Sequence, residues 1–453
     1  MPPLCGSNAE AFSIYGAPRA LPGVEGCLRD PLQEPATDQV CPGEAIGLAG
    51  AQAVAVSPDS ANVYVAGEDT VVALARDRSN GALHPASSSS ERACVTSDGS
   101  SPCAVKDAAL SGADALAISP DGRFVYVGAS NSGSVSAFVR GRGGTLAPLP
   151  ARTGRYAGCV AGVALAYAPQ PGCEAHTFAL SAVAALAISP DGRFLYAVSY
   201  GLHPGTDSIV ALQRNPRDGG LRPLSEKGDC FQSLPGGGCR SLAGLEGASA
   251  ITITPDGRFV YVTSQLSGSV RGFLRNRVTG ALTPLLGLGG CVSSGQQADQ
   301  DVQCVEKVPQ LAGARSLALS PDGRELYVAA FDPGAVVVLA RNRGDGRMSV
   351  LPPDCLQAEP DARCPVGLPF LRGATALAFR PHSSVLYATT EGGNCLVELL
   401  PGGSDGALTL ASDSPAVSDP LSGPVAFALS PGGGNIYVAS SFDDGVAALI
   451  TGP

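Results

Sequence analysis

The chain has 453 residues, of which 44% are hydrophobic and 15% are charged, and its formal net charge at pH 7 is −10. This length is enough for a large hydrophobic core, and by itself it suggests two or three domains. The sequence holds no apolar run of about 18 residues, which argues against a membrane-spanning helix. The excess of acidic residues argues against a nucleic-acid partner.

A short sequence recurs along the chain. SPDGRFVYV at residues 119–127 returns as SPDGRFLYA at 189–197. Every copy has proline second, a tyrosine seven positions after its start and a leucine nine positions before it. The copies start at Ser57, Ser119, Ser189, Thr254, Ser320, Arg380 and Ser430. Their spacing averages about 62 residues, and a fixed period indicates a repeat architecture instead of separate domains.

Each repeat unit contains four predicted strands. In the unit that begins at Leu311, a strand over 316–320 leads into a Pro-Asp-Gly turn, and ELYVAA forms the second strand. The β-branched run VVVLAR predicts the third strand, and MSVLP predicts a weaker fourth. The first strand of other units is expected at 115–119 and 185–189. Because no segment shows sustained helical periodicity, we predict an all-β fold, a seven-bladed β-propeller with four antiparallel strands per blade, formed by residues 1–453 as one domain.

The two ends of the chain complement each other. The last copy stops after three strands, and the N-terminal sequence AFSIYGAPRALPGV resembles the outer half of a unit. We therefore expect a strand from residues 1–25 to complete the seventh blade and close the ring, which removes open sheet edges.

Cysteine usage indicates disulfide bonds. Six close pairs lie at one place in the repeat, and they are Cys27 with Cys41, Cys94 with Cys103, Cys159 with Cys173, Cys230 with Cys239, Cys291 with Cys304, and Cys355 with Cys364. Zinc would need four converging ligands, whereas each unit supplies two, so local disulfides in an oxidising compartment are the better interpretation. Cys5 and Cys395 are left over, and they either bond to each other near the closure or remain free thiols.

These disulfides predict a secreted protein, located outside the cell or on its surface. The first residues, MPPLCGSNAE, have neither the basic nor the apolar region of a secretion signal. The signal is therefore either removed from this chain or replaced by another route of secretion.

The repeat resembles a known family. SPDGR followed by an aliphatic residue and Tyr-Val, a polar loop, a valine-rich strand and TGALTPL at 279–285 is similar to the YVTN-type and lactonase-like seven-bladed propellers of bacteria. The cysteine loops, such as GCVSSGQQADQDVQC, resemble those of secreted members of that superfamily. The resemblance implies the propeller fold and the possibility of lactone hydrolysis, but it transfers no catalytic residue, because the matching motifs are turn and core residues.

Propeller connectivity sorts the charged residues onto two faces. The Ser-Pro-Asp-Gly turns and the turns after the third strand share one face, where five arginine pairs collect: Arg76 and Arg78, Arg140 and Arg142, Arg214 and Arg217, Arg275 and Arg277, and Arg341 and Arg343. We expect these arginines to bond turn carbonyls and to pair with Asp77, Asp218 or Asp345, and a polyanion site is the alternative. The turn residues Asp121, Asp191, Asp256 and Asp322 are expected to be structural. The other face collects the acids of the loops between the second and third strands: Glu68, Asp69, Asp207, Asp332, Glu391, Asp443 and Asp444.

A catalytic site should break the repeat, because it needs residues that other blades lack. His203 lies in the longest loop between a second and a third strand, and His176 is expected in the cysteine loop of the same blade. With Tyr200 and Asp207 nearby, a histidine base supported by a carboxylate could open a lactone. Glu174, Asp207, Asp443 and Asp444 are the candidates for binding a metal such as Ca²⁺.

Three functions follow from these features. The first is a secreted binding or structural scaffold that needs no cofactor and uses its acidic loop face to contact a protein or carbohydrate. The second is a lactonase-like hydrolase with a site at the mouth of the central channel. The third is a calcium-stabilised surface protein. The sequence leaves the ligand and the oligomeric state open.

Overall fold

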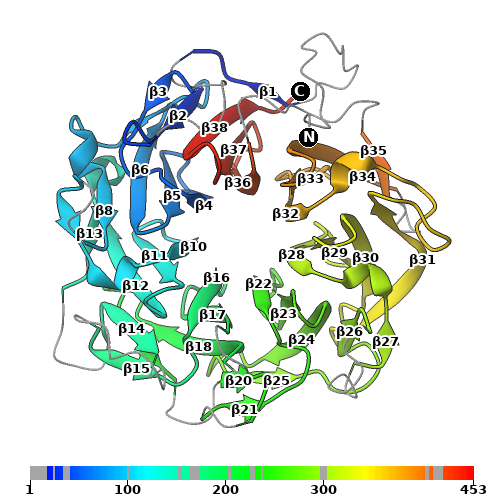
Figure 1. Ribbon diagram of the computed structural model, residues 1–453. Coiled ribbons are helices and arrows are strands. Elements are labelled where there is room, and N and C mark those ends of the chain that lie inside the picture. The colour runs from blue at the N-terminus through cyan, green and yellow to red at the C-terminus, as the bar shows by residue number, and fades with distance from the viewer. Residues whose placement is uncertain are drawn as a thin grey trace.

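The computed structural model is a ring of seven β-sheets, which we call blades 1 to 7 in chain order (Figure 1). The structure describes residues 18–23, 26–33, 41–98, 102–150, 156–162, 173–201, 206–224, 230–235, 238–295, 304–402, 408–411 and 422–452, and for 351–354 only the backbone. The predicted seven-bladed propeller is therefore confirmed.

Three antiparallel strands form the constant part of each blade. The innermost strands surround the ring axis, and they are β4 (Ala51–Val56), β10 (Ala113–Ile118), β16 (Ala182–Ile188), β22 (Ala248–Ile253), β28 (Ala314–Leu319), β32 (Ala374–Phe379) and β36 (Pro424–Leu429). The second strands are β5 (Asn62–Gly67), β11 (Phe124–Ala129), β17 (Phe194–Tyr200), β23 (Phe259–Ser264), β29 (Glu325–Ala330), β33 (Leu386–Thr390) and β37 (Asn435–Ser440). The third strands are β6 (Thr70–Arg76), β12 (Ser134–Arg140), β18 (Ser208–Arg214), β24 (Ser269–Arg275), β30 (Ala335–Arg341), β34 (Cys395–Pro401) and β38 (Gly445–Ile450).

The outer part of the blades differs from the prediction of one fourth strand. In blades 1 to 4 the third strand pairs with two short pieces, namely β7 (Leu83–Pro85) and β8 (Cys94–Thr96), β13 (Leu146–Pro148) and β14 (Cys159–Gly162), β19 (Leu221–Pro223) and β20 (Cys230–Gln232), and β25 (Leu282–Pro284) and β26 (Cys291–Ser293). Each second piece carries a further parallel strand, β9 (Val105–Lys106), β15 (Ala175–Thr177), β21 (Arg240–Ser241) or β27 (Glu306–Lys307). Blade 5 has one continuous strand, β31 (Met348–Gln357), and blade 6 has β35 (Leu408–Leu410).

The N-terminal segment closes the ring with the same outer pattern. In blade 7, β1 (Arg19–Ala20) and β2 (Cys27–Arg29) both pair with β38, and β3 (Gly43–Glu44) lies parallel to β2. Closure by the N-terminus is confirmed, but β2 and β3 lie beyond the predicted segment 1–25, and residues 1–17 lie outside the described residues.

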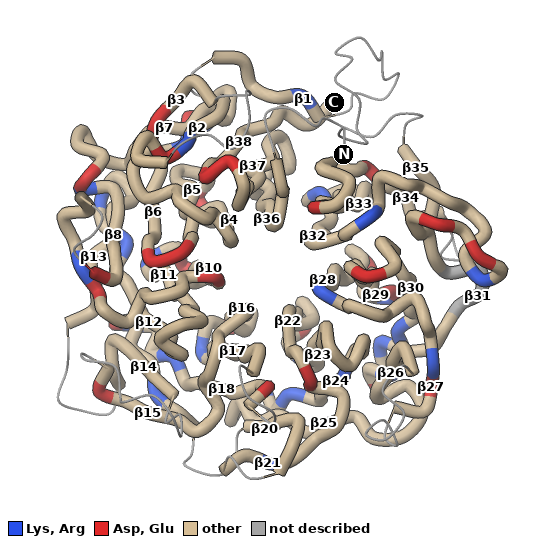
Figure 2. The backbone as a smooth tube through the Cα atoms, in the orientation of Figure 1, with Lys and Arg blue, Asp and Glu red and all other residues tan. Residues whose placement is uncertain are grey.

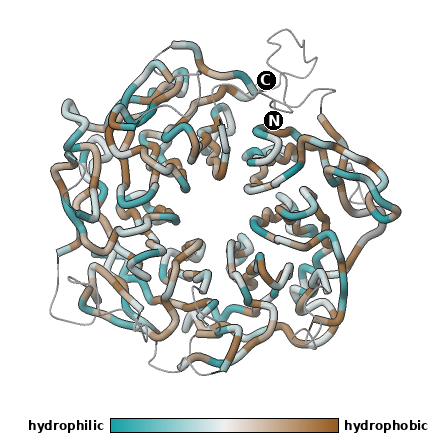
Figure 3. Tube along the Cα trace, viewed as in Figure 1, coloured by the Kyte–Doolittle hydropathy of each residue, from teal (hydrophilic) through white to brown (hydrophobic). Residues whose placement is uncertain are grey.

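Hydrophobic side chains fill the space between neighbouring blades. One core cluster, for example, joins Val71 and Val95 of blade 1 to Leu116, Val125 and Phe138 of blade 2. Hydrophobic segments recur in all seven blades in Figure 3. Because each blade is covered on both faces, its strands are apolar almost throughout and not alternating. The innermost strands begin two or three residues earlier than predicted and end one residue earlier.

All six predicted local disulfides form, with Cα–Cα distances of 4.6 to 5.3 Å and separations of 9 to 14 residues. They join Cys27 to Cys41, Cys94 to Cys103, Cys159 to Cys173, Cys230 to Cys239, Cys291 to Cys304, and Cys355 to Cys364. In blades 7 and 1 to 4, each disulfide fastens the second outer piece to the chain just before its parallel strand. The predicted pairing of these twelve cysteines is therefore confirmed.

The two remaining cysteines were predicted to bond to each other or to remain free thiols. Cys395 is disulfide-bonded, so it is not a free thiol. Cys5 lies outside the described residues, so its predicted bond to Cys395 stays a prediction.

The helices are single turns: η1 (Ser90–Arg92), η2 (Ala108–Leu110), η3 (Arg142–Gly144), η4 (Pro309–Leu311) and η5 (Pro369–Leu371). In the described part of the chain, none has the length and hydrophobicity to cross a bilayer.

Candidate functional site: the axial end of the loop face

The loops between second and third strands lie at one end of the ring, which we call the loop face, and the Ser-Pro-Asp-Gly turns lie at the other, the turn face. Several loop-face acids hold neighbouring blades together. Asp444 accepts a hydrogen bond from Gly50 N (2.6 Å), and Asp69 accepts one from Gly112 N (2.9 Å). Each bond runs from the start of a third strand to the turn before the next blade's innermost strand. These carboxylates therefore brace the ring.

Asp207 is the most buried of these braces, with 5% of its surface exposed. Its Oδ1 accepts hydrogen bonds from Gly201 N (2.8 Å) and from Gly247 N of blade 4 (2.7 Å), and Ser233 Oγ donates to its Oδ2 (3.2 Å). These bonds close the neck of the loop that contains His203. His203 itself lies outside the described residues.

The other predicted site residues are spread over several elements. Tyr200 ends β17 of blade 3 and is half-buried. His176 is exposed in β15, the outermost strand of blade 2, so its predicted place in the same blade as the His203 loop is wrong. Glu174 is exposed beside Cys173, and Asp443 accepts a hydrogen bond from Ser422 N. Among the described residues, no hydrogen bond joins His176, Tyr200 and Asp207, and no three His, Cys, Asp or Glu side chains gather as metal ligands.

At one repeat position near the ring axis, two blades carry a charged residue where the other blades carry an uncharged one. Every innermost strand shows a register shift at its loop-face end. The residue at this bulge lies four positions after the repeat leucine, and across the seven blades it is Gln52, Asp114, Ala184, Ser249, Arg315, Thr375 and Val425. Five blades carry an uncharged residue there, whereas β10 carries Asp114 and β28 carries Arg315. These strands lie on opposite sides of the ring axis, and acidic and basic segments are seen on them in Figure 2.

The carboxyl group of Asp114 has a pKa well above the usual value for aspartate. Burial raises the pKa of this carboxyl to about 6, a hydrogen bond from Ser130 opposes the shift, and the nearby charge of Asp69 adds to it. A carboxyl group with this pKa exchanges its proton near neutral pH, which suits general acid or base catalysis.

Arg315 is held by two neighbours. Its Nη1 lies 3.2 Å from Glu391 Oε2 of blade 6, and its guanidinium lies over the Phe331 ring at 5.2 Å from the centroid. The Arg315 and Glu391 side chains are 31% and 25% exposed, so solvent reaches both. Sequence reasoning missed Asp114 and Arg315, although aligning the seven repeats on their leucines would have found both.

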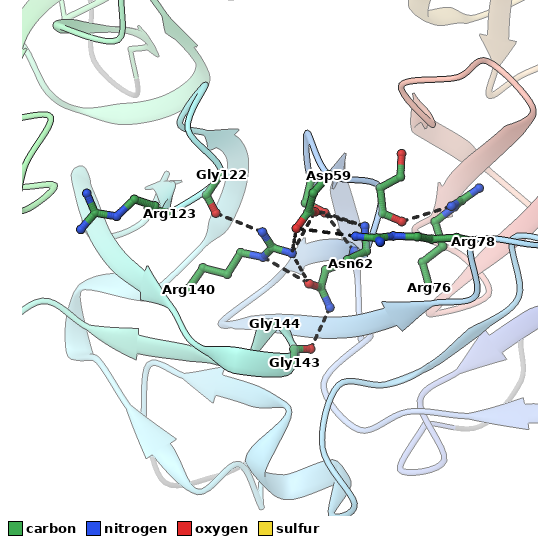
Figure 4. A network of polar contacts seen from close by, with 12 residues as sticks. Asp59, Asn62, Arg76, Arg78, Gly122, Arg123, Arg140, Gly143 and Gly144 are labelled. Atoms are coloured by element: carbon green, nitrogen blue, oxygen red, sulfur yellow. Dashed lines mark hydrogen bonds and ion pairs between the residues drawn. The ribbon is translucent and has the colours of Figure 1, made fainter.

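On the turn face, the first arginine of each predicted pair joins two blades. Arg140 donates to Gly122 O of its own blade (3.1 Å) and to Asp59 of blade 1 (2.9 Å), and Figure 4 shows it between these residues and Asn62. Arg275 likewise bonds Gly257 O and pairs with Asp191 of the preceding blade at 3.0 Å. The predicted bonds to turn carbonyls are thus confirmed.

The predicted local partners of these arginines are wrong for the first member of each pair. For Arg140, Arg214 and Arg275 the paired acid belongs to the preceding blade, because the arginine extends from the end of its third strand across the blade junction. Arg76 bonds Asn435 of the preceding blade in the same way. The turn aspartates also have the expected structural role: Asp121 accepts from Ser119 Oγ and from Arg123 N (3.2 Å).

Comparison with known proteins confirms the resemblance to lactonase-like propellers. The family described as "Lactonase, 7-bladed beta-propeller" matches residues 165–287, from the cysteine loop of blade 2 to the outer strand of blade 4. No curated protein matches the chain.

Three solved structures illustrate the breadth of the fold. A periplasmic gluconolactonase of Pseudomonas aeruginosa is 18% identical, with 85% of this chain and 91% of that chain covered and a TM-score of 0.57. A putative 6-phosphogluconolactonase of Bacteroides uniformis is 20% identical, with 80% and 86% covered and a TM-score of 0.50. Hydrazine synthase of Kuenenia stuttgartiensis is 15% identical, with 93% and 99% covered and a TM-score of 0.54. Such different names on one fold mean that function must be argued from the site.

Proposed function

We propose that this lactonase-like propeller is a lactone hydrolase that acts at the axial end of its loop face, with Asp114 as the general base. One observation carries the proposal: blade 2 has a carboxyl group, Asp114, at a bulge near the ring axis where five blades have an uncharged residue. Burial raises the pKa of this carboxyl to about 6, which suits a general base. The family match over residues 165–287 and the lactonase-like fold support the choice of substrate.

The reaction needs little more than a base and a positioned water. Ionised Asp114 removes a proton from water, and the water oxygen bonds to the lactone carbonyl carbon. The ring C–O bond then breaks, and the released alkoxide takes up the proton from Asp114, which gives a hydroxycarboxylic acid. At neutral pH this acid releases its carboxyl proton to water and becomes a hydroxycarboxylate. General base assistance of this kind typically contributes 10²- to 10⁴-fold in rate. His203 stays a candidate for proton transfer to the leaving oxygen, whereas His176 lies in β15, at the opposite edge of the blade 2 sheet from Asp114 in β10.

A panel of five- and six-membered lactones at pH 7.5 tests this proposal with wild-type protein and Asp114→Asn. We expect turnover by the wild type and a loss of about 10²-fold or more in the variant. Asp332→Asn, which changes an exposed carboxylate of the loop face, is the matched control and should retain full activity. Absence of turnover in the wild type, or equal turnover in Asp114→Asn, would exclude the proposed role.

Folding of the variant can be verified separately. Because burial disfavours the charged form of Asp114, Asp114→Asn should be at least as stable as the wild type at pH 7.5. If Asp114→Asn turns over lactones more slowly but is at least as stable as the wild type, the loss of turnover comes from the catalytic step and not from unfolding.

Secretion and cofactor use belong to the same proposal. The six disulfides are consistent with an oxidising compartment outside the cytoplasm. The hydrolytic step uses protein side chains and water, so it needs no cofactor, and a Ca²⁺ ion would serve only to stabilise the acidic loops.

A binding scaffold is the second candidate, and the exposed apolar side chains of the loop face favour it. Leu266 and Phe442 lie in loops between second and third strands and are 51% and 55% exposed.

Because Asp444 is a structural brace, charge reversal at Glu68 and Asp332 is the better test of a basic protein partner. With polylysine as the probe, the double reversal should weaken binding and reduce its salt dependence. Unchanged binding would exclude this surface.

A further inference from the structure

We propose that Arg315 forms a carboxylate-binding subsite at the axial end of the loop face and holds the hydroxycarboxylate that lactone opening produces. This inference rests on the proposed function for the identity of the ligand, but its evidence is separate. It concerns blade 5, on the side of the ring axis opposite β10.

The neighbouring blades show what the bulge position does when its role is structural. In blade 4, Ser249 Oγ donates to Ala314 O of the next innermost strand (2.9 Å). In blade 6, Thr375 Oγ1 donates to Pro424 O in the same way (3.1 Å). A short hydroxyl side chain therefore joins adjacent innermost strands. Blade 5 lies between these two blades and has Arg315 at the same position. There the next residue, Ser316, makes the connection, because its Oγ accepts a hydrogen bond from Leu377 N of β32 (3.2 Å), so the guanidinium is not needed for it.

The contacts of Arg315 fix its orientation without using all its donors. Glu391 approaches Nη1, and the Phe331 ring covers one face of the guanidinium. Within the described residues, no other hydrogen bond or ion pair of the Arg315 side chain is found. Nε and Nη2 are therefore available, and a guanidinium presents such donors in a planar fork that matches a carboxylate.

The ion pair between Arg315 and Glu391 is expected to contribute little to the stability of the fold. A solvent-accessible Arg–Glu pair typically contributes only about 0–1 kcal/mol, and it costs side-chain entropy. By contrast, a guanidinium held in place by an aromatic ring and a carboxylate binds an anion with less loss of conformational freedom. The ion pair and the ring therefore serve to orient Arg315 toward a ligand.

The chemistry of the ligand follows from the reaction. Ring opening converts a neutral ester into a carboxylate, and a cation across the ring axis from Asp114 attracts this anionic product more strongly than the neutral lactone. Arg315 should accordingly bind the product and make it a competitive inhibitor of turnover.

Isothermal titration with two matched probes tests the subsite. Gluconate and sorbitol have the same chain length and differ in the carboxylate. We expect gluconate to bind wild-type protein and sorbitol to bind at least tenfold more weakly, because hydrogen bonds to a charged group are stronger than neutral ones. Arg315→Gln should lose roughly tenfold or more in gluconate affinity, and Arg315→Lys should recover part of it.

Arg324→Gln is the control, since Arg324 is an exposed arginine on the turn face whose guanidinium lies 3.5 Å from Asp322. It should bind gluconate like the wild type. No gluconate binding by the wild type, or equal binding by Arg315→Gln, would overturn the inference.

The outcomes also separate this inference from the proposed function. Asp114→Asn should lose turnover but keep gluconate binding. If lactones are hydrolysed and Arg315→Gln retains both turnover and product inhibition, the subsite is wrong and the hydrolase stands. If no lactone is hydrolysed but gluconate binding depends on Arg315, the subsite stands and the hydrolase is wrong.

Discussion

Arg214 Nε donates a hydrogen bond of 2.6 Å to the hydroxyl oxygen of Tyr126, which belongs to the preceding blade. The tyrosine hydroxyl in turn donates to Gly219 O of the arginine's own blade (2.7 Å). The bond between arginine and tyrosine recurs in Arg275 with Tyr196, Arg341 with Tyr261, and Arg76 with Tyr437. The repeated tyrosine therefore joins blades, and burial, as the largest effect, raises its pKa so that the hydroxyl keeps its proton.

Loss of Arg214 should destabilise the ring. Arg214→Ala removes the bonds to Tyr126 and Gly192 O and leaves a cavity beside Phe124, so we expect a loss of about 2–4 kcal/mol in the free energy of unfolding. Urea unfolding followed by circular dichroism measures it. Arg217→Ala, an exposed arginine of the same face, should stay within about 0.5 kcal/mol of the wild type. Equal effects of the two changes would contradict the stabilising role of the bond between Arg214 and Tyr126.

The turn aspartates should make stability depend on acid pH. Burial tends to raise the pKa of Asp121 and Asp191, but hydrogen bonds from Ser119 and Ser189, the backbone and the arginines outweigh it, and the net pKa is lowered from 3.8. A carboxyl whose folded-state pKa is depressed adds stability above its unfolded-state pKa and loses it as pH falls through the folded-state value. The free energy of unfolding should fall below about pH 4. In Asp191→Asn that decrease should be smaller, and an unchanged pH profile would refute its contribution.

Asp207 should prove structural and not catalytic. Asp207→Ala leaves the buried Gly247 N–H and the part-buried Gly201 N–H without their acceptor, and an unsatisfied buried group costs about 1–3 kcal/mol. Asp207→Asn keeps an oxygen for these donors, so it should retain most of the stability. It should also retain most lactone turnover, whereas a loss of 10²-fold in a stable Asp207→Asn protein would return this residue to the catalytic candidates.

Ring closure can be tested by truncation. Deleting residues 1–25 removes β1 but leaves β2 and β3 on β38, whereas deleting 1–30 also removes β2 and Asp30, whose Oδ2 accepts from Gly47 N (2.8 Å). The longer deletion should lower both the melting temperature and the solubility more than the shorter one, because it exposes the edge of β38. Equal melting of the two truncated proteins would show that β2 does not contribute to closure.

The fold could be predicted from the sequence because its signals repeat. Proline, tyrosine and leucine at fixed distances set the period, and the cysteine spacing gave the disulfides. The short outer strands could not be predicted, since β3, β9 and β27 have two residues each and depend on the preceding disulfide loop for their position. Their pairing is tertiary, and local residue preferences do not report it.

The site was harder to predict than the fold. Asp207 and Asp444 are recognisable in the sequence as acidic loop residues. Whether their carboxylates face solvent or accept hydrogen bonds from the backbone of the next blade depends on how the blades pack, which the sequence does not show. Likewise, the arginine partners lie far away in the chain: 78 residues for Arg140 with Asn62, 88 for Arg214 with Tyr126 and 361 for Arg76 with Tyr437. Asp114 was detectable as a departure from the repeat, but its raised pKa comes from burial that only the folded ring provides.

The pH dependence of kcat/KM for the best lactone substrate tests the central claim most directly. Because Asp114 must be ionised to accept a proton, kcat/KM should rise with pH and reach half of its plateau near the pKa of Asp114, about 6. In Asp114→Asn this rise should disappear together with most of the rate. The same rise in the variant, or the absence of lactone turnover by the wild type at every pH, would contradict the assignment of Asp114 as the base of a lactone hydrolase.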